Sequence, residues 1–356
     1  MLIVDAHLDL AWNAMQWNRD LQLSVYTLRA QESSLSEPGR GQNTVALPEM
    51  RQGRVALCFS TLLARSTGRV EANIDYSSTA QAYAAAQGQL AYYNALAEQS
   101  VIHLITNLLQ LNEHIAEWDQ WELDTNKNQP LPGFIVSMES ADPILGPEQL
   151  SAWHEAGVRI IGPAHYGAGR FAGGTSTELG FTSIGFALLR EMEQLGIILD
   201  LTHLSDQAFW QALEKFNGTI LASHNNCRSL VPNQRQFDDA QIRSIIERKG
   251  VIGAALDNWM IRAGWVRGKT DDLRVNLNDV VDHIDHICQL AGNCQHAAIG
   301  SDLDGGFGRE QSPSDLDTIA DLQKLTEILA SRGYDENDIT AIMHSNWLHL
   351  LRSAWS

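Results

Sequence analysis

Cysteine is scarce in this chain, and long apolar runs are missing. The four cysteines form no Cys-x-x-Cys pair among the 356 residues; they are Cys58, Cys227, Cys288 and Cys294. This scarcity excludes the dense disulfide framework of a small secreted domain and favours reduced thiols. No uninterrupted apolar run approaches the roughly 18 residues that a membrane span needs. The longest candidate, residues 101–111, contains His103, Thr106 and Asn107.

Positive charge is also in short supply. There are 25 Lys and Arg against 43 Asp and Glu, which gives a net charge of −18. This balance argues against nucleic acid and against an anionic membrane surface as partners, because both would repel the chain. The N-terminus opens Met-Leu-Ile-Val-Asp, without the basic and apolar segments of a signal peptide. We therefore expect a cytoplasmic enzyme without a membrane anchor.

What the chain does have is apolar residues, at 44% of the total, which is enough for a large core and excludes global disorder. We find no internal repeat and no low-complexity tract. The length admits two domains, but one α/β barrel of ~250 residues with insertions fits as well. Residues 31–42 and 119–132 are polar and are expected to be loops, and neither forms a clear linker. We expect a single domain over residues 1–356.

Two kinds of apolar segment alternate along the sequence. Short runs, apolar throughout, are typical of strands buried on both faces; they are 2–4, 55–60, 134–137, 158–161, 197–201, 219–222, 251–254 and 297–299. Between them lie helical patterns, at 77–98, 147–156, 181–195, 205–216, 238–249, 276–291, 314–331 and 335–350. Ser205 and Asp206 are expected to begin one helix, and Gly250 and Gly292 to end two others.

Eight strands and eight helices in alternation predict a (β/α)8 TIM barrel. An open doubly wound sheet is the alternative. That fold would favour a glycine-rich phosphate-binding turn after the first strand, where this chain reads His-Leu-Asp-Leu.

Residues able to bind metals recur at the carboxyl ends of the predicted strands, which meet at the catalytic face of a barrel. They are His7, Asp9, Glu139, His165, His203, His224, Asp302 and Asp304. In an extended strand, the i, i+2 spacing of His7 and Asp9 turns both side chains to one side. Neutral imidazole and carboxylate suit zinc or a similar divalent ion.

Each residue also has a plainer interpretation as a polar strand end, a helix cap or a loop residue. Their recurrence at successive strand ends favours a metal centre. Four histidines, one glutamate and one aspartate make six ligand groups, which are too many for one tetrahedral zinc. We therefore expect two metals bridged by Glu139. Metals about 3.5–4 Å apart can share a hydroxide that serves as a hydrolytic nucleophile. The other eight histidines fall in or beside helical patterns, or ahead of a strand, and are interpreted as structural.

Three further features adjoin these residues. Asp302 could accept and return the proton of the water, although it could also shape a turn, which is the role expected for Asp304. Arg235 or Arg228 could bind a substrate carboxylate, unless they pair with Asp238 or Asp239.

The glycine-rich stretch 167–174 lacks the ending of a phosphate-binding loop, so we expect a flexible loop beside the site. There is no Gly-x-Ser-x-Gly motif, and Cys227 is interpreted as a bystander.

Taken in order, these segments resemble the membrane (renal) dipeptidase family, peptidase family M19 of the amidohydrolase-like barrels. The resemblance covers about residues 5–347. It rests on D-A-H-L-D, S-M-E, G-V-R-I-I-G-P-A-H, L-D-L-T-H-L-S, S-H-N-N-C-R with a second Arg eleven residues past the His, I-G-S-D-L-D-G and N-W-L-H-L-L. No single segment is specific, but their order and spacing together are.

The resemblance implies a role for each of these residues. His7, Asp9 and Glu139 would hold one zinc ion, and Glu139, His203 and His224 the other. His165 would stabilise the oxyanion, Asp302 would shuttle the proton, and Arg235 would bind the C-terminal carboxylate of the substrate. The substrate implied is a dipeptide, and many family members accept a D-residue at its C-terminal position. A homodimer is also implied.

The chain departs from the family pattern in two places. Glu139 is followed by Ser140 and Ala141, where family members often carry two glycines. His165 is preceded by Ala164 in place of the usual Thr, and is followed by Y-G-A-G-R-F-A-G-G in place of an Asn-rich, Asp-containing stretch. Because that loop borders the substrate's amino end, Arg170 is a candidate to bind an acidic side chain there.

Two alternatives to a dipeptidase stay open, namely a metal-dependent hydrolase of another small amide or lactone, and a barrel that binds small peptides without cleaving them.

Overall fold

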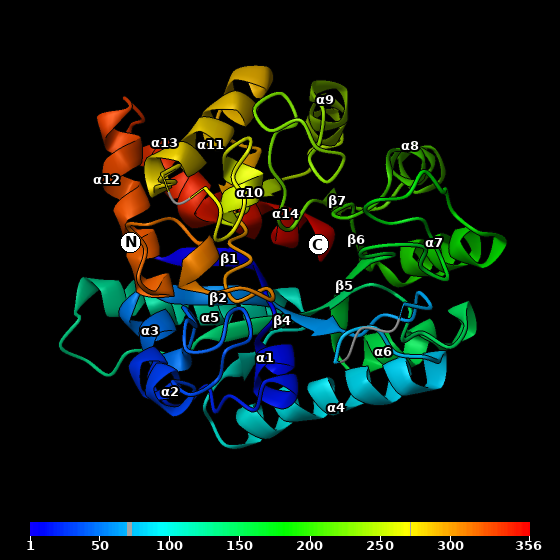
Figure 1. Ribbon diagram of the computed structural model, residues 1–356, viewed down its shortest axis with the longest axis horizontal. Coiled ribbons are helices and arrows are strands. Elements are labelled where there is room, and N and C mark those ends of the chain that lie inside the picture. Colours follow the sequence, from blue (N-terminus) through cyan, green and yellow to red (C-terminus); the bar gives the residue numbers. More distant parts are fainter. Residues whose placement is uncertain (70–72, 271) are drawn as a thin grey trace.

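The computed structural model describes residues 1–69, 73–270 and 272–356. Strands and helices alternate along most of the chain (Figure 1). The strands are β1 (Ile3–Leu8), β2 (Val55–Leu63), β3 (His103–Leu104), β4 (Gly133–Glu139), β5 (Val158–Gly162), β6 (Ile198–Asp200), β7 (Ile220–Leu221), β8 (Ile252–Ala254) and β9 (Ala297–Ile299).

Helices surround these strands. The α-helices are α1 (Leu10–Gln16), α2 (Val25–Gln31), α3 (Leu47–Gln52), α4 (Thr79–Glu98), α5 (Leu108–Leu123), α6 (Leu150–Glu155), α7 (Ser183–Leu195), α8 (Asp206–Lys215), α9 (Asp239–Glu247), α10 (Asn258–Ile261), α11 (Leu277–Ala291), α12 (Lys324–Ser331), α13 (Glu336–Thr340) and α14 (Asn346–Ala354). Short segments of other helical types are η1 (Pro147–Gln149), η2 (Arg309–Gln311), η3 (Ile319–Gln323) and η4 (Ala341–Ser345).

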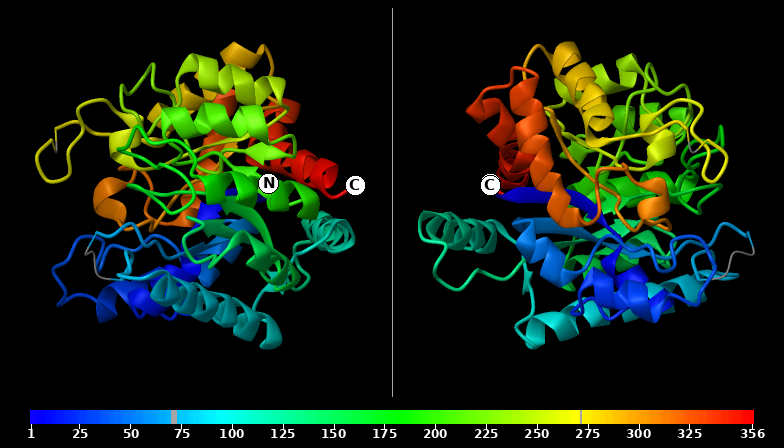
Figure 2. Two further views of the ribbon diagram at one scale, coloured as in Figure 1. Left: turned by 90° about the vertical axis from the view of Figure 1, so that its right-hand side faces the viewer. Right: turned by 60° about the vertical axis from the view of Figure 1, so that its left-hand side comes forward.

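All strand pairs are parallel, in the order β7-β6-β5-β4-β2-β1-β9-β8. A parallel bridge between Ala222 and Ile252 brings the edge strands β7 and β8 together. The eight strands therefore form a nearly closed barrel with helices outside it (Figure 2). This confirms the predicted barrel and excludes the open doubly wound sheet. The ninth strand, β3, was not predicted and pairs with β4 off the main path.

The two faces of the strands pack into two different clusters. One cluster draws residues from seven barrel strands, among them Val4, Leu57 and Ile135, together with Val251 just before β8, and so fills the interior. Neighbouring strand residues such as Ile3, Cys58 and Phe134 belong to the larger cluster between strands and helices. Burial on both faces explains why the strand sequences are apolar throughout.

Helix α14 closes one end of the barrel. Its Trp347 belongs to the interior cluster, packs edge-on against Phe59 at 5.4 Å between ring centroids, and donates its indole N–H to the carbonyl of Ile299 at 2.9 Å. Asn346 donates to the carbonyl of Ala297, where β9 begins. The amino ends of the strands are thus sealed by apolar side chains, and the carboxyl ends are left for a site.

Each of the eight predicted helical patterns contains a helix in the structure, and the errors concern the other helices and boundaries. Helices α1, α2, α3, α5 and α10 were not predicted. Residues 119–132 are not all loop, because α5 continues to Leu123; Asn107 caps this helix, and Leu111, Ile115 and Trp118 bury one face of it. No helix among the described residues is long and apolar enough to cross a membrane.

The predicted helix ends are correct at two positions out of three. The hydroxyl of Ser205 accepts from the N–H of Ala208 at 3.1 Å, and Gly292 ends α11 with φ +71°. Gly250 is not a helix cap, because α9 ends at Glu247 and Lys249 supplies the left-handed residue with φ +56°.

Candidate metal centre and substrate cavity

Five predicted ligands gather at the carboxyl end of the barrel. His7 lies in β1, Asp9 follows that strand, and Glu139 is the last residue of β4. His203 and His224 follow β6 and β7. Each of the five is at most 7% exposed. The structure therefore brings together side chains that are more than 200 residues apart in sequence.

Glu139 lies between two groups of ligands. Its Oε2 is 3.6 Å from Nε2 of His7. Its Oε1 is 3.1 Å from Nε2 of His203 and 3.4 Å from Nε2 of His224. Two sets of potential ligand atoms result, one from His7, Asp9 and Glu139 and one from Glu139, His203 and His224. A single carboxylate thus presents one oxygen to each set.

An irregularity in β1 turns His7 toward the site. Asp5 pairs with Cys58 and Leu8 with Ser60, so β1 advances three residues while β2 advances two. Strict alternation would place His7 on the opposite face from Ala6, which packs inside the barrel. The extra residue breaks this alternation, as a β-bulge does. The nitrogen Nε2 of His7 then lies 3.8 Å from Oδ1 of Asp9.

Hydroxyl groups orient three of these ligands. Nδ1 of His203 is 3.0 Å from the Thr175 hydroxyl, which itself donates to the His203 carbonyl and so accepts from the ring. Nδ1 of His224 is 2.9 Å from the Ser223 hydroxyl, and the Thr61 hydroxyl donates to Asp9. With its proton on Nδ1, His203 directs the Nε2 lone pair into the site, 3.1 Å from Nε2 of His224. A metal ion bound by both Nε2 atoms would place the proton of His224 on Nδ1 as well, where the Ser223 hydroxyl can accept it.

The electrostatics of the cluster also suit a cation. Burial lowers the pKa of His203 and of His224 well below the usual range, which keeps both rings neutral, as metal ligands must be. Burial raises the pKa of Glu139 to about 8. Burial alone would lower the pKa of His7, but the carboxylates of Glu139 and its neighbours raise it to about 10. Among the described residues, the buried Nε2 of His7 has no hydrogen-bond partner. These residues fit a pair of divalent metal ions.

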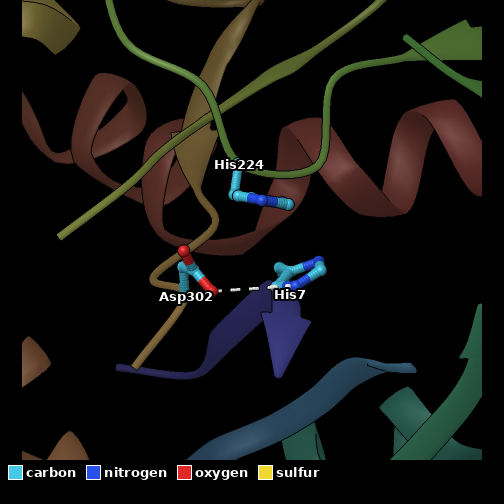
Figure 3. Close-up of side chains that lie close together, drawn as sticks. All are labelled: His7, His224 and Asp302. Carbon is cyan, nitrogen blue, oxygen red and sulfur yellow. Dashed lines mark ion pairs between the residues drawn. The ribbon is translucent and has the colours of Figure 1, made fainter. Parts of the chain in front are cut away.

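Asp302 lies at the same site, after β9. Figure 3 shows Asp302, His7 and His224 pointing toward one another, and Oδ1 of Asp302 is 3.8 Å from Nε2 of His7. Burial raises the pKa of Asp302 well above its usual range. Asp304 has a structural role outside its own turn, because its carboxylate accepts from the N–H groups of Thr44 and Val45.

Three residues at this site have a strained backbone. His203, Asp302 and Ser140 have φ values of +67°, +57° and +76°, in the left-handed region that disfavours side chains. Strain of this kind is typical of functional sites, where the surrounding structure enforces it. It also explains one departure from the family pattern, because the residue after Glu139 has a conformation that glycine adopts without cost.

His165 lies beside the ligand cluster, after β5. Its Nε2 is 3.7 Å from Oε1 of Glu139, and its Nδ1 is 2.9 Å from a guanidinium nitrogen of Arg65. Since Arg65 can only donate, Nδ1 of His165 accepts and Nε2 carries the proton. Burial lowers the pKa of His165 well below its usual range, so the ring is a neutral donor. Asp75 pairs with Arg65 at 3.0 Å and holds it in place.

A cavity of about 360 Å³ opens above the cluster, which is within the range of small-molecule sites. Arg235 lines it and is 3% exposed. Its guanidinium donates to the His224 carbonyl at 2.8 Å and to Asn225, and no acidic side chain pairs with it within the described ranges. Arg228 instead pairs with Asp206 at 2.6 Å and does not line the cavity. Of the two arginines considered for binding a substrate carboxylate, only Arg235 is placed to reach a ligand in the cavity.

Two expectations for the loop after His165 need correction. Arg170 does not line the cavity, because its guanidinium donates to the carbonyls of Ile144 and Leu145. The stretch 167–174 is a compact turn and not an open flexible loop. The N–H of Gly174 donates to the Gly167 carbonyl at 2.8 Å, and a side chain at Gly174 would collide with the His165 carbonyl.

Sequence reasoning missed several residues of the site and its surroundings. Arg65, Tyr166 and Asp257 line the cavity, and Thr61 and Thr175 orient ligands. Applying the strand-end criterion to residues 55–60 and 251–254 would have indicated Thr61, Arg65 and Asp257. No sequence signal distinguished Thr175, because its position depends on how the loop after β5 folds back.

A parallel barrel whose carboxyl end holds histidines around a shared carboxylate defines the class of metal-dependent hydrolases. The family comparison is more specific. The family model described as membrane dipeptidase (peptidase family M19) matches residues 1–355. The chain belongs to this family of metallopeptidases.

Relatives agree with this assignment. A Klebsiella pneumoniae protein, named only by its place in the pqqA 5' region, is 32% identical over 214 residues, which cover 58% of this chain and 76% of that protein. Mouse Dipeptidase 3 is 29% identical over 211 residues, which cover 57% of this chain and 40% of the mouse protein. This chain therefore matches well under half the length of the mouse dipeptidase.

A solved structure matches the whole fold. It is a metallopeptidase from Rhodobacter sphaeroides bound to a phosphinate mimic of the dipeptide L-Ala-D-Ala, with a TM-score of 0.77 and 23% identity. The alignment covers 100% of this chain and 99% of that one. At this identity, the likeness shows the shared fold.

Proposed function

We propose that this protein is a binuclear zinc dipeptidase. One observation carries the proposal, namely that Glu139 presents Oε2 to His7 and Oε1 to His203 and His224. In this proposal one zinc ion is held by His7, Asp9 and Glu139, and the other by Glu139, His203 and His224. Zinc ions bound there would supply a water of lowered pKa and would polarise the peptide carbonyl.

In this proposal, Arg235 binds the C-terminal carboxylate of the substrate. A buried guanidinium that lines a cavity, with no acidic partner among the described side chains, suits a carboxylate brought by a ligand. A dipeptide places its free carboxylate one residue from the scissile bond, so this contact would set the register of the peptide over the metal centre. Substrates without that carboxylate should bind poorly.

His165 and Asp302 account for the charge and proton that move during hydrolysis. Nε2–H of His165 would donate to the carbonyl oxygen as negative charge develops on it. Arg65 keeps this proton on Nε2 by donating to Nδ1. Asp302 would take the proton of the attacking water and pass it to the departing amine. Its raised pKa suits a group that must hold a proton briefly.

We further propose that the enzyme accepts a D-residue at the C-terminal position. The Rhodobacter metallopeptidase of the same fold binds a mimic of L-Ala-D-Ala, which is the reason for testing this stereochemistry. A homodimer and a cytoplasmic location also remain predictions. Light scattering of the purified protein and fractionation of cells would test them.

The first experiment measures amino-acid release from L-L and L-D dipeptides by zinc-loaded enzyme, beside a chelated control. Release that depends on metal supports the proposal. No release from any dipeptide, with two zinc ions bound, would overturn it and direct attention to lactones and other small amides. If none of these substrates is turned over, a barrel that only binds peptides becomes the better account.

A variant separates the role of Asp302 from metal binding. Asp302→Asn should retain both metals, measured by elemental analysis, and lose at least about a hundredfold in turnover because the proton shuttle is gone. Unchanged turnover with both metals bound would show that Asp302 has another role.

A further inference from the structure

An acidic side chain that the proposed mechanism does not use lines the cavity. Asp257 follows β8, directly before α10, and is 5% exposed. It borders the same cavity as Arg235, Trp259 and Met260. Its position after a strand places it at the catalytic end of the barrel.

The carboxylate of Asp257 lacks a cationic partner. Its two oxygens accept from the Gln311 side-chain amide at 2.9 and 3.0 Å, and one lies 3.4 Å from the backbone N–H of Trp259. No Lys, Arg or His lies within ion-pair distance of it in the parts of the chain that the structure describes. Burial accordingly raises the pKa of Asp257 to about 7.

Some buried acids in the molecule are paired with arginine, whereas in the described part of the chain Asp5 and Asp200 accept only from neutral donors and lie outside the cavity. Glu32 accepts from Arg19 at 2.9 Å and from Arg40 at 2.7 Å, and Asp75 accepts from Arg65 at 3.0 Å. Removing a carboxylate from water is costly unless an opposite charge accompanies it. The carboxylate of Asp257 is buried without such an opposite charge among the described residues, at a position where a ligand would bind.

Capping α10 does not account for this residue. The helix has four residues, and the 3.4 Å contact to Trp259 is too long for a strong hydrogen bond. Ser24 and Ser205 cap longer helices in this chain with a hydroxyl. A cap therefore needs no buried charge at position 257.

We propose that Asp257 selects dipeptides whose C-terminal residue has a long cationic side chain, with an ammonium or guanidinium group that pairs with its carboxylate. This inference rests on the proposed function, because Arg235 must hold the neighbouring C-terminal carboxylate. Trp259 and Met260 offer apolar surface for the methylene stem of such a side chain. The substrate's cation replaces the missing partner of the buried carboxylate.

The test compares side chains of similar length that differ in charge. We would measure kcat/KM for L-alanyl-lysine, L-alanyl-norleucine and L-alanyl-glutamate, with L and D stereochemistry at the C-terminal residue. The wild-type enzyme should prefer lysine over norleucine by at least about tenfold and should reject glutamate. A wild-type enzyme that cleaves these dipeptides without favouring lysine overturns the inference and leaves the dipeptidase proposal standing. Failure to cleave any dipeptide would instead overturn the dipeptidase proposal.

Variants then identify the residue responsible. Asp257→Asn and Asp257→Ser both retain a capping group, and each should bring the lysine-to-norleucine ratio to within about twofold of one. Asp335→Asn is the matched control, because Asp335 caps α13 and lies outside the cavity. It should retain the wild-type ratio. If the Asp257 variants lose lysine and norleucine turnover equally, the carboxylate contacts a group common to all dipeptides, such as the α-amino group, and the inference is wrong.

Discussion

The two ends of the barrel are built on opposite principles. At the amino end, Trp347 of α14 fills the interior beside Phe59, and its N–H is satisfied by a carbonyl. At the carboxyl end, buried polar side chains face one another, and Nε2 of His7 has no hydrogen-bond partner within the described part of the chain. One end gains stability from burial, and the other holds ionisable groups out of water at a cost.

Backbone strain does not follow the same division. The left-handed residues Ser140, His203 and Asp302 belong to the loops at the carboxyl end, but Arg54 and Lys249 are left-handed just before β2 and β8 at the amino end. We conclude that the sealed end stabilises a fold whose open end holds charged groups out of water. Four predictions test this division.

The largest effect is expected from Glu139→Gln. Replacing the shared carboxylate should abolish binding of both metals and lower turnover by more than about a thousandfold, because both ligand sets lose an anionic oxygen. Elemental analysis and dipeptide release would measure this. Glu98→Gln, at the exposed end of α4, is the control and should behave as wild type. Full metal content in Glu139→Gln would refute the bridging role.

Trp347→Ala tests the sealed end. Removing a fully buried indole should lower the free energy of unfolding by about 3–5 kcal/mol. Urea denaturation would measure the loss. The folded fraction should still bind two metals, because the indole does not contact the site. A loss of metal affinity in fully folded protein would show that the two ends are coupled.

The pH dependence of stability should reveal the contribution of His283, which holds the loop after β7 at the carboxyl end of the barrel. Burial lowers the pKa of His283 to about 4; this side chain accepts from the N–H of Cys227 and lies 3.1 Å from the carbonyl of Ile261. The unfolded chain binds this proton near pH 6.5 and the folded chain near pH 4, so the free energy of unfolding should fall as the pH drops between these values. The loss due to this residue is about 3 kcal/mol.

His283→Gln isolates this contribution. The amide can replace both hydrogen bonds but does not titrate, so thermal unfolding of the variant should change less between pH 6.5 and 4 than that of the wild type. His344, whose pKa burial also lowers to about 4, is present in both proteins and cancels in the comparison. Identical pH profiles would contradict the assignment to His283.

The smallest effect is expected at Ser140. Glycine at this position would relieve the cost of φ +76°, about 1–2 kcal/mol, but would lose about 0.5–1 kcal/mol to a more flexible unfolded chain. Ser140→Gly should therefore stabilise the protein by up to about 1 kcal/mol and retain activity. Ser140→Ala should destabilise it, because the strain stays and the contact with the N–H of Asp142 is lost. Calorimetry of the two variants would test this contrast.

Much of the fold was predictable because its signal is local. Strands buried on both faces read as short apolar runs, and all eight barrel strands were located in this way. The two-residue strand β3 was missed because so short a segment has no pattern of its own. Helix α5 was placed partly in a loop because three of its last five residues, Asp119, Gln120 and Glu122, are polar.

The side chains that gather at the candidate site were predictable, and the residues that orient them were not. His7, Glu139 and His203 could be identified because strand ends in a barrel converge on one face. Arg65 could not be linked to His165 in this way, because the pairing joins side chains 100 residues apart. Arg170 was a plausible substrate contact by position alone, yet its guanidinium turns to nearby backbone carbonyls.

By itself, the sequence determined the alternation of strands and helices, the residue types at the strand ends and the family. Each of these depends on short sequence patterns and on their order along the chain. Only the tertiary structure decided which charges are paired. It showed that Arg235 lines the cavity whereas Arg228 pairs with Asp206, and it turned His7 into the site through an irregular strand. It also left Asp257 in the cavity with no cationic partner in the part of the chain that the structure describes. These outcomes depend on the distances between side chains from distant segments, and folding alone sets such distances.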